Sequence, residues 1–152
     1  MNVDLVNHPP HYESRSGVEC IDVVRHLPFS LGNCVKYVWR YNEKWNPKED
    51  LDKSLWYLED YMVNPLSSIF VYTDPGYSEG KASSVLELIL RHEMYLTEVD
   101  PMAARVFQSL HKYLRFEGSA ETVDRNLKIL WYDIASLRED VARTKTWGGT
   151  IG

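Results

Sequence analysis

The residues best suited to chemistry form a polar stripe along one predicted helix. Five residues at helical spacing make up this stripe: Asn33, Lys36, Tyr37, Arg40 and Lys44. Three cations on one helix face repel one another unless an anion or acidic side chains lie between them. The stripe therefore fits two interpretations, a cradle for phosphate groups or a solvated face that is paired with nearby acids. The acids in question are Glu43, Glu49 and Asp50.

A second polar group follows at the start of the next predicted helix. Asp50 and Asp52 could orient a nucleophile or hold Mg²⁺, which prefers hard oxygen ligands, and Lys53 and Trp56 follow closely. The simpler interpretation is that acids are favoured in the first turn of any helix, where the helix dipole is positive. Glu49 and Lys53 would then form an ordinary ion pair four residues apart.

The N-terminal segment carries a rigid block, HPPHY at residues 8–12, that cannot be helical at its centre. We expect an ordered arm or loop whose histidines contact a phosphate or transfer a proton. Two histidines separated by two prolines make a poor metal clamp, and no third ligand is in view, so no metal site is expected there. Cys20 and Cys34 lie in predicted helices without a CxxC motif, which indicates reduced, buried thiols.

Two further motifs match known nucleotide-enzyme sites only in part. Residues 76–83, GYSEGKAS, follow an apolar run as a phosphate-binding loop does, but the spacing is one residue short and Ala82 replaces the hydroxyl that binds magnesium. The chain also lacks the series of strands that such a loop requires. Glu19 and Asp22, with the acids at 49–52, loosely resemble the paired carboxylates of MazG-like nucleoside triphosphate pyrophosphatases, which are all-helical and use magnesium.

Composition narrows the function classes. The chain has 152 residues, 44% of them hydrophobic, which suits one compact domain or two very small ones. Its formal net charge of −5 leaves no basic face for wrapping duplex DNA, although a local cluster of cations can still hold a small anion. The 5 Trp and 10 Tyr residues suit cores, wet interfaces and base-stacking pockets. No leader peptide or membrane span is evident, so we expect a soluble, cytoplasmic protein.

The elements that must position these residues are helices. Periodicity, caps and breakers predict helices over 19–27, 30–42 with Ser30 as cap, 46–64 with Asn46 as cap, 84–98, and 100–116 with Asp100 as cap. A long last helix carries a heptad seam that needs a partner helix, from this chain or another. The seam residues are Val123, Leu127, Leu130, Ile134, Leu137 and Val141. We expect an all-α bundle of five to six helices, with one short strand or other non-helical segment near 69–73.

The two halves of the chain share landmarks in the same order, which is consistent with a duplicated helical unit. The paired segments are RH at 25–26 and 91–92, KY at 36–37 and 112–113, and LWY at 55–57 and 130–132. This divides the chain into a first unit, 1–64, a linker or short strand, 65–82, and a second unit, 83–146, that serves oligomerisation or is a degenerate copy. Residues 147–152 are too rich in glycine for a helix, and we expect a flexible tail.

Four blocks in the first half, taken together, closely resemble one family. They are VNHPPHY at 6–12, GVECID at 17–22, residues 32–44 with Gly32, Asn33, Lys36, Tyr37, Arg40 and Lys44, and residues 49–58 with Glu49, Asp50, Leu51, Lys53, Trp56, Tyr57 and Leu58. The family is the SaV-like, nucleotide-kinase-like group of small bacteriophage proteins. The resemblance covers residues of about 6–62 and leaves the C-terminal half unexplained.

The resemblance implies a phage protein that transfers a phosphoryl group from ATP or another nucleoside triphosphate to nucleoside monophosphates without a P-loop, in the cytoplasm of the infected bacterium. Its catalytic candidates are Lys36, Arg40 and Asp50. Its substrate-binding candidates are His8, His11, Tyr12, Asn33, Tyr37, Lys44, Lys53 and Trp56. Mg²⁺ is a further candidate cofactor, held or oriented through Asp50.

Two alternatives stay open. The same cations and rings could sequester a nucleotide signal of a host defence system without turnover, or the chain could be a MazG-like pyrophosphatase that uses Glu19 and Asp22. The expected partners are nucleotides and further copies of the chain, joined in a homo-oligomer through the heptad helix 123–141. Neither duplex nucleic acid nor a membrane is expected as a partner.

Overall fold

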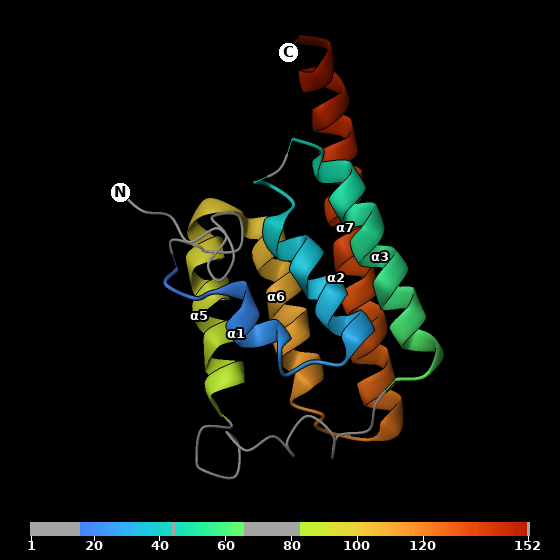
Figure 1. The fold of residues 1–152 in the computed structure, drawn as a ribbon. Coiled ribbons are helices and arrows are strands. Elements are labelled where there is room, and N and C mark those ends of the chain that lie inside the picture. Colours follow the sequence, from blue (N-terminus) through green and yellow to red (C-terminus); the bar gives the residue numbers. More distant parts are fainter. Residues whose placement is uncertain (1–15, 44, 66–82, 152) are drawn as a thin grey trace.

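Six helices make up the described part of the chain, and no strand occurs there (Figure 1). A computed structural model describes residues 16–43, 45–65 and 83–151, with the backbone alone at 83–84 and 145–151. The helices are α1 (Cys20–Val24), α2 (Phe29–Arg40), α3 (Pro47–Val63), α5 (Ser83–Val99), α6 (Pro101–Leu114) and α7 (Ala120–Ile151). The predicted all-α bundle is confirmed. The strand expected near 69–73 and the linker from residue 66 to 82 lie outside the described residues.

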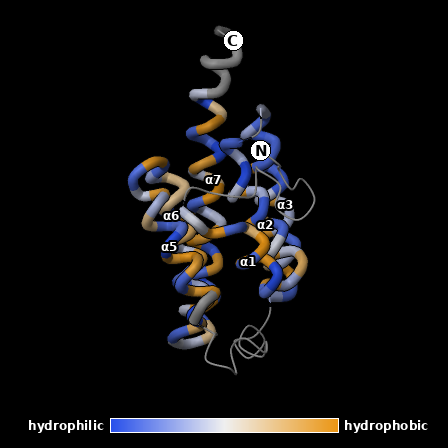
Figure 2. Tube along the Cα trace, turned by 60° about the vertical axis from the view of Figure 1, so that its left-hand side comes forward, coloured by the Kyte–Doolittle hydropathy of each residue, from blue (hydrophilic) through white to orange (hydrophobic). Residues whose placement is uncertain are grey.

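The helices pack as successive antiparallel neighbours. α2 packs against α3, α5 against α6 and α6 against α7. α3 also lies beside α7, and this contact joins the first half of the chain to the second. The buried side chains form one core cluster that includes Leu31 of α2, Leu58 of α3, Ile89 of α5, Phe107 of α6 and Leu130 of α7. Figure 2 shows apolar and polar stretches alternating along the helices, as expected of helices that bury one face.

The two sequence halves share that core, and their matching landmarks lie in different environments. Tyr37 is half-buried on α2, whereas Tyr113 is buried in the core, where its hydroxyl lies 2.7 Å from that of Tyr61. His26 is half-buried, whereas His92 is buried and stacks on Trp39. The repeated dipeptides therefore lie in unlike environments, and the duplication stays a prediction.

Helix starts follow the predicted caps at two places and differ at a third. Asn46 accepts a hydrogen bond from the backbone N–H of Glu49, and Asp100 accepts one from that of Ala103, and a proline follows each cap. The prediction that Ser30 caps the second helix is wrong, because α2 already begins at Phe29. The Ser30 hydroxyl instead donates to the carboxylate of Asp60 on α3.

The heptad seam of α7 finds its partner helices within the chain. Leu127, Leu130, Ile134 and Leu137 are buried, and α7 packs against α6 and α3. The seam is therefore not available for the expected homo-oligomer, because the bundle itself already covers these side chains.

The prediction of a non-helical tail at 147–152 is wrong as far as the structure describes it. α7 continues through Gly148 and Gly149 to Ile151. A helix that is already nucleated gains one hydrogen bond for each added residue, and a glycine costs only about 1 kcal/mol relative to alanine. In Figure 1 this end of α7 projects past the other helices. No helix in the described part of the chain combines the length and the apolar composition that a membrane span requires.

Candidate functional site

The predicted polar stripe lies on the outer side of the α2–α3 hairpin. α2 buries Leu31, Cys34, Val35 and Val38, which turns Lys36, Tyr37 and Arg40 toward a less buried face. The Asn46 cap starts α3 a short turn later, and α3 returns along α2. Residues of α2 and α3 that are distant in the sequence are therefore brought into contact.

Three cations surround the ring of Tyr37. The Nζ atom of Lys36 lies 4.4 Å from the ring centroid, the guanidinium carbon of Arg40 lies 5.4 Å from it, and Nζ of Lys53 lies 5.6 Å from it. The negative face of an aromatic ring attracts cations at such distances. The ring also stacks with that of Tyr57 at a centroid distance of 5.9 Å. We call Lys36, Tyr37, Arg40 and Lys53 the cationic face.

The acid expected to act on substrate is engaged by one of these cations. Arg40 Nε lies 3.4 Å from Asp50 Oδ2, and the two side chains are 17% and 5% exposed. A buried pair of this kind holds both side chains in one direction. The structure therefore places Asp50 where it positions Arg40, and the catalytic role expected of Asp50 from the sequence stays a prediction.

The other two cations differ in their partners. Lys53 Nζ lies 3.7 Å from Glu49 Oε1 in an exposed pair four residues apart, as predicted. Lys36 has no carboxylate within 4.0 Å among the described residues. An exposed pair of this kind stabilises a protein by at most about 1 kcal/mol, so both ammonium groups can turn to an incoming anion at little cost.

The remaining predicted residues divide into those near the face and those outside the described part. Trp56 is 64% exposed and lies edge-on to Tyr57 at 5.0 Å, so it is the ring with a free surface for stacking. Asn33 donates its amide hydrogen to the carbonyl oxygen of Phe29. Tyr57 was not among the site residues predicted from the sequence, although it directly follows Trp56, which was among them. His8, His11, Tyr12 and Lys44 lie outside the described residues.

The carboxylates near the face do not gather into a group of three metal ligands among the described residues. Asp52 accepts from Lys48 at 2.8 Å and from Arg138 of α7 at 3.3 Å. Asp22, which the pyrophosphatase alternative requires, pairs with Arg25 at 3.3 Å. Within the described ranges, no group of three or more His, Cys, Asp or Glu side chains is arranged to hold a metal ion. We therefore assign no metal ligand to these residues.

The two cysteines are structural. Both thiols are free and buried, as predicted, and burial raises the pKa of each to about 12. The positive charge of Lys36 acts in the opposite direction on Cys20, and a hydrogen bond with Ser54 does so on Cys34. Such thiols stay protonated at neutral pH and are poor nucleophiles.

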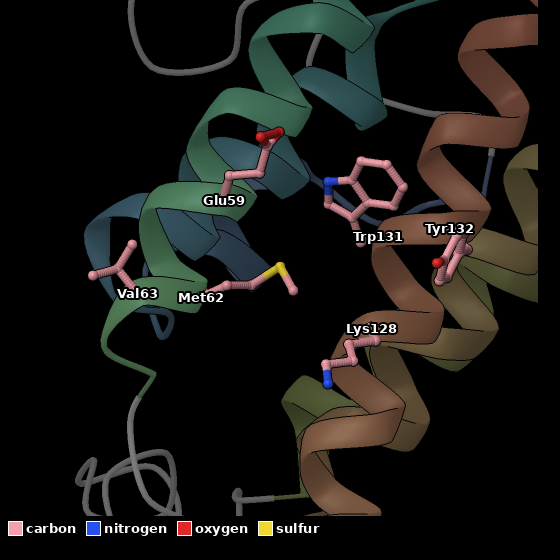
Figure 3. A pocket seen from close by; sticks show the side chains of 6 residues that line it. All are labelled: Glu59, Met62, Val63, Lys128, Trp131 and Tyr132. Atoms are coloured by element: carbon pink, nitrogen blue, oxygen red, sulfur yellow. The ribbon is translucent and has the colours of Figure 1, made fainter.

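A groove of about 460 Å³ lies between α3 and α7 and contains none of the predicted site residues (Figure 3). Its lining comprises Glu59, Met62, Val63, Lys128, Trp131 and Tyr132. In Figure 3 the Met62 side chain points into the space between the two helices, and the indole of Trp131 extends from α7 toward α3. The groove is mostly apolar, in contrast to the cationic face.

Comparison with known proteins gives one match. The model of the DUF3310 family, described as a protein of unknown function, matches residues 6–59. Neither the curated proteins nor the solved structures contain a match to the chain. The matched segment contains the whole cationic face, together with Asp50 and Trp56, and ends within α3. The helices α5, α6 and α7 lie outside it.

Proposed function

We propose that the chain binds nucleotides at the cationic face and transfers a phosphoryl group from a nucleoside triphosphate to a nucleoside monophosphate. The proposal includes a bacteriophage origin and action in the cytoplasm of the infected bacterium, in line with the resemblance of residues 6–62. The observation that carries it is the gathering of Lys36, Arg40 and Lys53 within 6 Å of one ring, with the buried carboxylate of Asp50 paired to Arg40.

Each residue of the face has a role in this proposal. Lys36 and Arg40 stabilise the negative charge of the phosphoryl groups, which is most of what phosphoryl transfer demands of a protein. The Asp50 carboxylate fixes the direction of the Arg40 guanidinium, so less order has to be created on binding. Trp56 stacks on the base, and Lys53 contacts an outer phosphate after leaving Glu49. His8, His11, Tyr12 and Lys44 stay candidate substrate contacts.

A second candidate function is binding without turnover, in which the protein sequesters a nucleotide signal of a host defence system. One observation favours it specifically. Asp50 is the carboxylate closest to the cations, and in the structure it is buried against Arg40. Sequestration needs only cations and a stacking ring, and the face has both.

Product analysis separates the two functions. The purified protein is incubated with each nucleoside monophosphate, with and without ATP and magnesium, and both the solution and the protein-bound fraction are analysed by chromatography. The kinase proposal predicts a nucleoside diphosphate that disappears in Lys36→Ala and Arg40→Ala. Recovery of an intact nucleotide from the heated protein, without turnover, would establish sequestration. Absence of both binding and turnover would contradict both functions.

A further inference from the structure

A second groove, of about 350 Å³, lies between α6 and α7 and is lined mainly by polar residues. It shares no residue with the cationic face. α6 contributes Arg105, Ser109 and Lys112 to its lining, and α7 contributes Asn126, Ile129 and Asp133. The spacings of four, three and seven residues place each set on one face of its helix. This groove lies outside the segment that matches the family model.

Two cations in the groove have no acidic partner. Arg105 and Lys112 are both exposed, and neither has a carboxylate within 4.0 Å in the part of the chain that the structure describes. Seven residues separate them, which is about 10 Å along the helix axis. Their long, flexible side chains can both reach one anion between them. The only acid in the lining, Asp133, already accepts a hydrogen bond from the hydroxyl of Ser109.

Asn126 is the least expected residue of the groove. It is only 6% exposed, and its side-chain amide makes no hydrogen bond to any described residue. Its amide atoms reach the surface of the groove, because Trp39 Nε1 is the one enclosed side-chain polar atom without a partner among the described residues. Since Asn126 lines the groove, its donor and its acceptor are available to a molecule bound there.

Ile129 gives the groove an apolar contact, because its side chain is 40% exposed beside these polar groups. The concave space therefore offers a small molecule two cations, one amide and one apolar side chain, which can supply charge, hydrogen bonds and an apolar contact. The volume lies at the lower end of the range for small-molecule sites, which suits a molecule of mononucleotide size.

We propose that the α6–α7 groove binds a small organic phosphate of mononucleotide size. Arg105 and Lys112 hold the phosphate group, because two cations can share its oxygens. The Asn126 amide pairs with a group at the other end of the ligand that offers both a donor and an acceptor, such as the edge of a nucleobase. This proposal does not depend on the function of the cationic face.

Titration calorimetry on the full chain tests the proposal, with AMP, GMP, CMP and UMP, ribose 5-phosphate and inorganic phosphate as probes. The measurements use the Lys36→Ala background, in which binding at the cationic face is weakened. We expect Arg105→Gln/Lys112→Gln to weaken the binding of the best nucleotide and of ribose 5-phosphate at least tenfold. Asn126→Leu should weaken the nucleotide about tenfold and leave ribose 5-phosphate unchanged, with a melting temperature that is equal to or above that of the parent.

Four results would overturn the proposal. They are the absence of saturable binding of every probe, equal binding in the Arg105→Gln/Lys112→Gln variant, equal loss of both organic probes in Asn126→Leu, and binding of inorganic phosphate as tight as that of the nucleotide. If the leucine variant does not fold, Asn126→Ala supplies the same comparison. Variants in this groove and Lys36→Ala act on different helices, so failure of one site is distinguishable from failure of the other.

Discussion

The guanidinium of Arg40 and the carboxylate of Asp50 form a largely buried pair, 3.4 Å apart, that joins α2 to the first turn of α3. The pair lies beside the ring of Tyr37, which Lys36 and Lys53 also approach. One carboxylate therefore orders one of three cations, and the other two keep their freedom to meet an anion. The predictions on Asp50 and on Lys36 rest on this difference between Arg40 and the two lysines.

Removing Asp50 should destabilise the fold, because it leaves the charge of Arg40 without its partner. Breaking a buried pair by removing one member costs about 3–5 kcal/mol, and the partial exposure of Arg40 places Asp50→Leu at the lower end. The double variant Arg40→Met/Asp50→Leu should recover most of the loss. Urea unfolding of the parent, Arg40→Met, Asp50→Leu and the double variant measures this cycle, and equal stability of Asp50→Leu and the parent would show that the pair contributes nothing.

Trp56 should contribute to nucleotide binding without contributing to stability. Its ring is 64% exposed, and stacking of a base on an aromatic ring contributes about 1–3 kcal/mol, so Trp56→Ala should raise the dissociation constant of a nucleotide about ten- to hundredfold. Tyr132→Ala is the matched control, because Tyr132 is 65% exposed on α7. Equal effects of the two variants on affinity would exclude a specific role for Trp56. Calorimetric titration and thermal unfolding supply the two readouts.

The hydroxyl groups of Tyr61 and Tyr113 lie 2.7 Å apart in the core and should be energetically coupled. Burial and this hydrogen bond raise the pKa of Tyr113 above its ordinary value, so its hydroxyl stays protonated. Tyr113→Phe removes the hydrogen bond between the two hydroxyl groups and should cost about 1 kcal/mol, and Tyr61→Phe/Tyr113→Phe should cost less than the sum of the two single variants. Additive losses in urea unfolding would contradict the coupling.

His92 should make the fold less stable in mild acid. Its ring stacks on Trp39 at 3.8 Å, its Nδ1 lies 3.0 Å from the Ser16 hydroxyl, and burial lowers its pKa from 6.5 to about 4. Because the folded state holds the neutral ring, the unfolded chain binds more protons between these values. The contribution is complete above pH 6.5 and is lost as the pH falls toward 4, by about 3 kcal/mol.

His92→Phe supplies the comparison for this pH dependence, since phenylalanine keeps an aromatic ring against Trp39 and does not titrate. Stability measured by urea unfolding at several pH values should fall less steeply in the variant than in the parent between pH 6.5 and 4. Parallel curves would show that the native ring titrates at its ordinary pKa.

The sequence carries enough information for the helices but not for the state of each polar group. The Asn46 and Asp100 caps and the apolar spacing of α7 are local patterns, and the structure confirms the helices that they predict. Whether the α7 seam pairs within the chain or between chains depends on where α3 lies, which spacing does not encode. The end of α7 also runs past its glycines, because propensity is weak against an existing helix.

The site was predictable as a cluster, but the roles of its members were not. The spacing of Lys36, Tyr37 and Arg40 correctly predicts that they share a face. The sequence offers Asp50 as one of three acids that could pair with the stripe, but its spacing does not show that Arg40, ten residues earlier, is the cation it faces. Asn126 and Arg105 carry no local signal for a shared groove, because α6 and α7 bring them together only through tertiary packing.

The most direct test of the nucleotide proposal is the dissociation constant of a nucleotide for the parent and for Lys36→Gln, with Lys128→Gln as the control. Lys128 is a lysine on α7 that pairs with Asp124 in an exposed position. Since a hydrogen bond to a charged group contributes about 1.5–3 kcal/mol, Lys36→Gln should weaken binding about ten- to hundredfold at unchanged melting temperature, and Lys128→Gln should change neither. Binding that is absent from the parent, or that is equal in all three proteins, would contradict a nucleotide site at the cationic face.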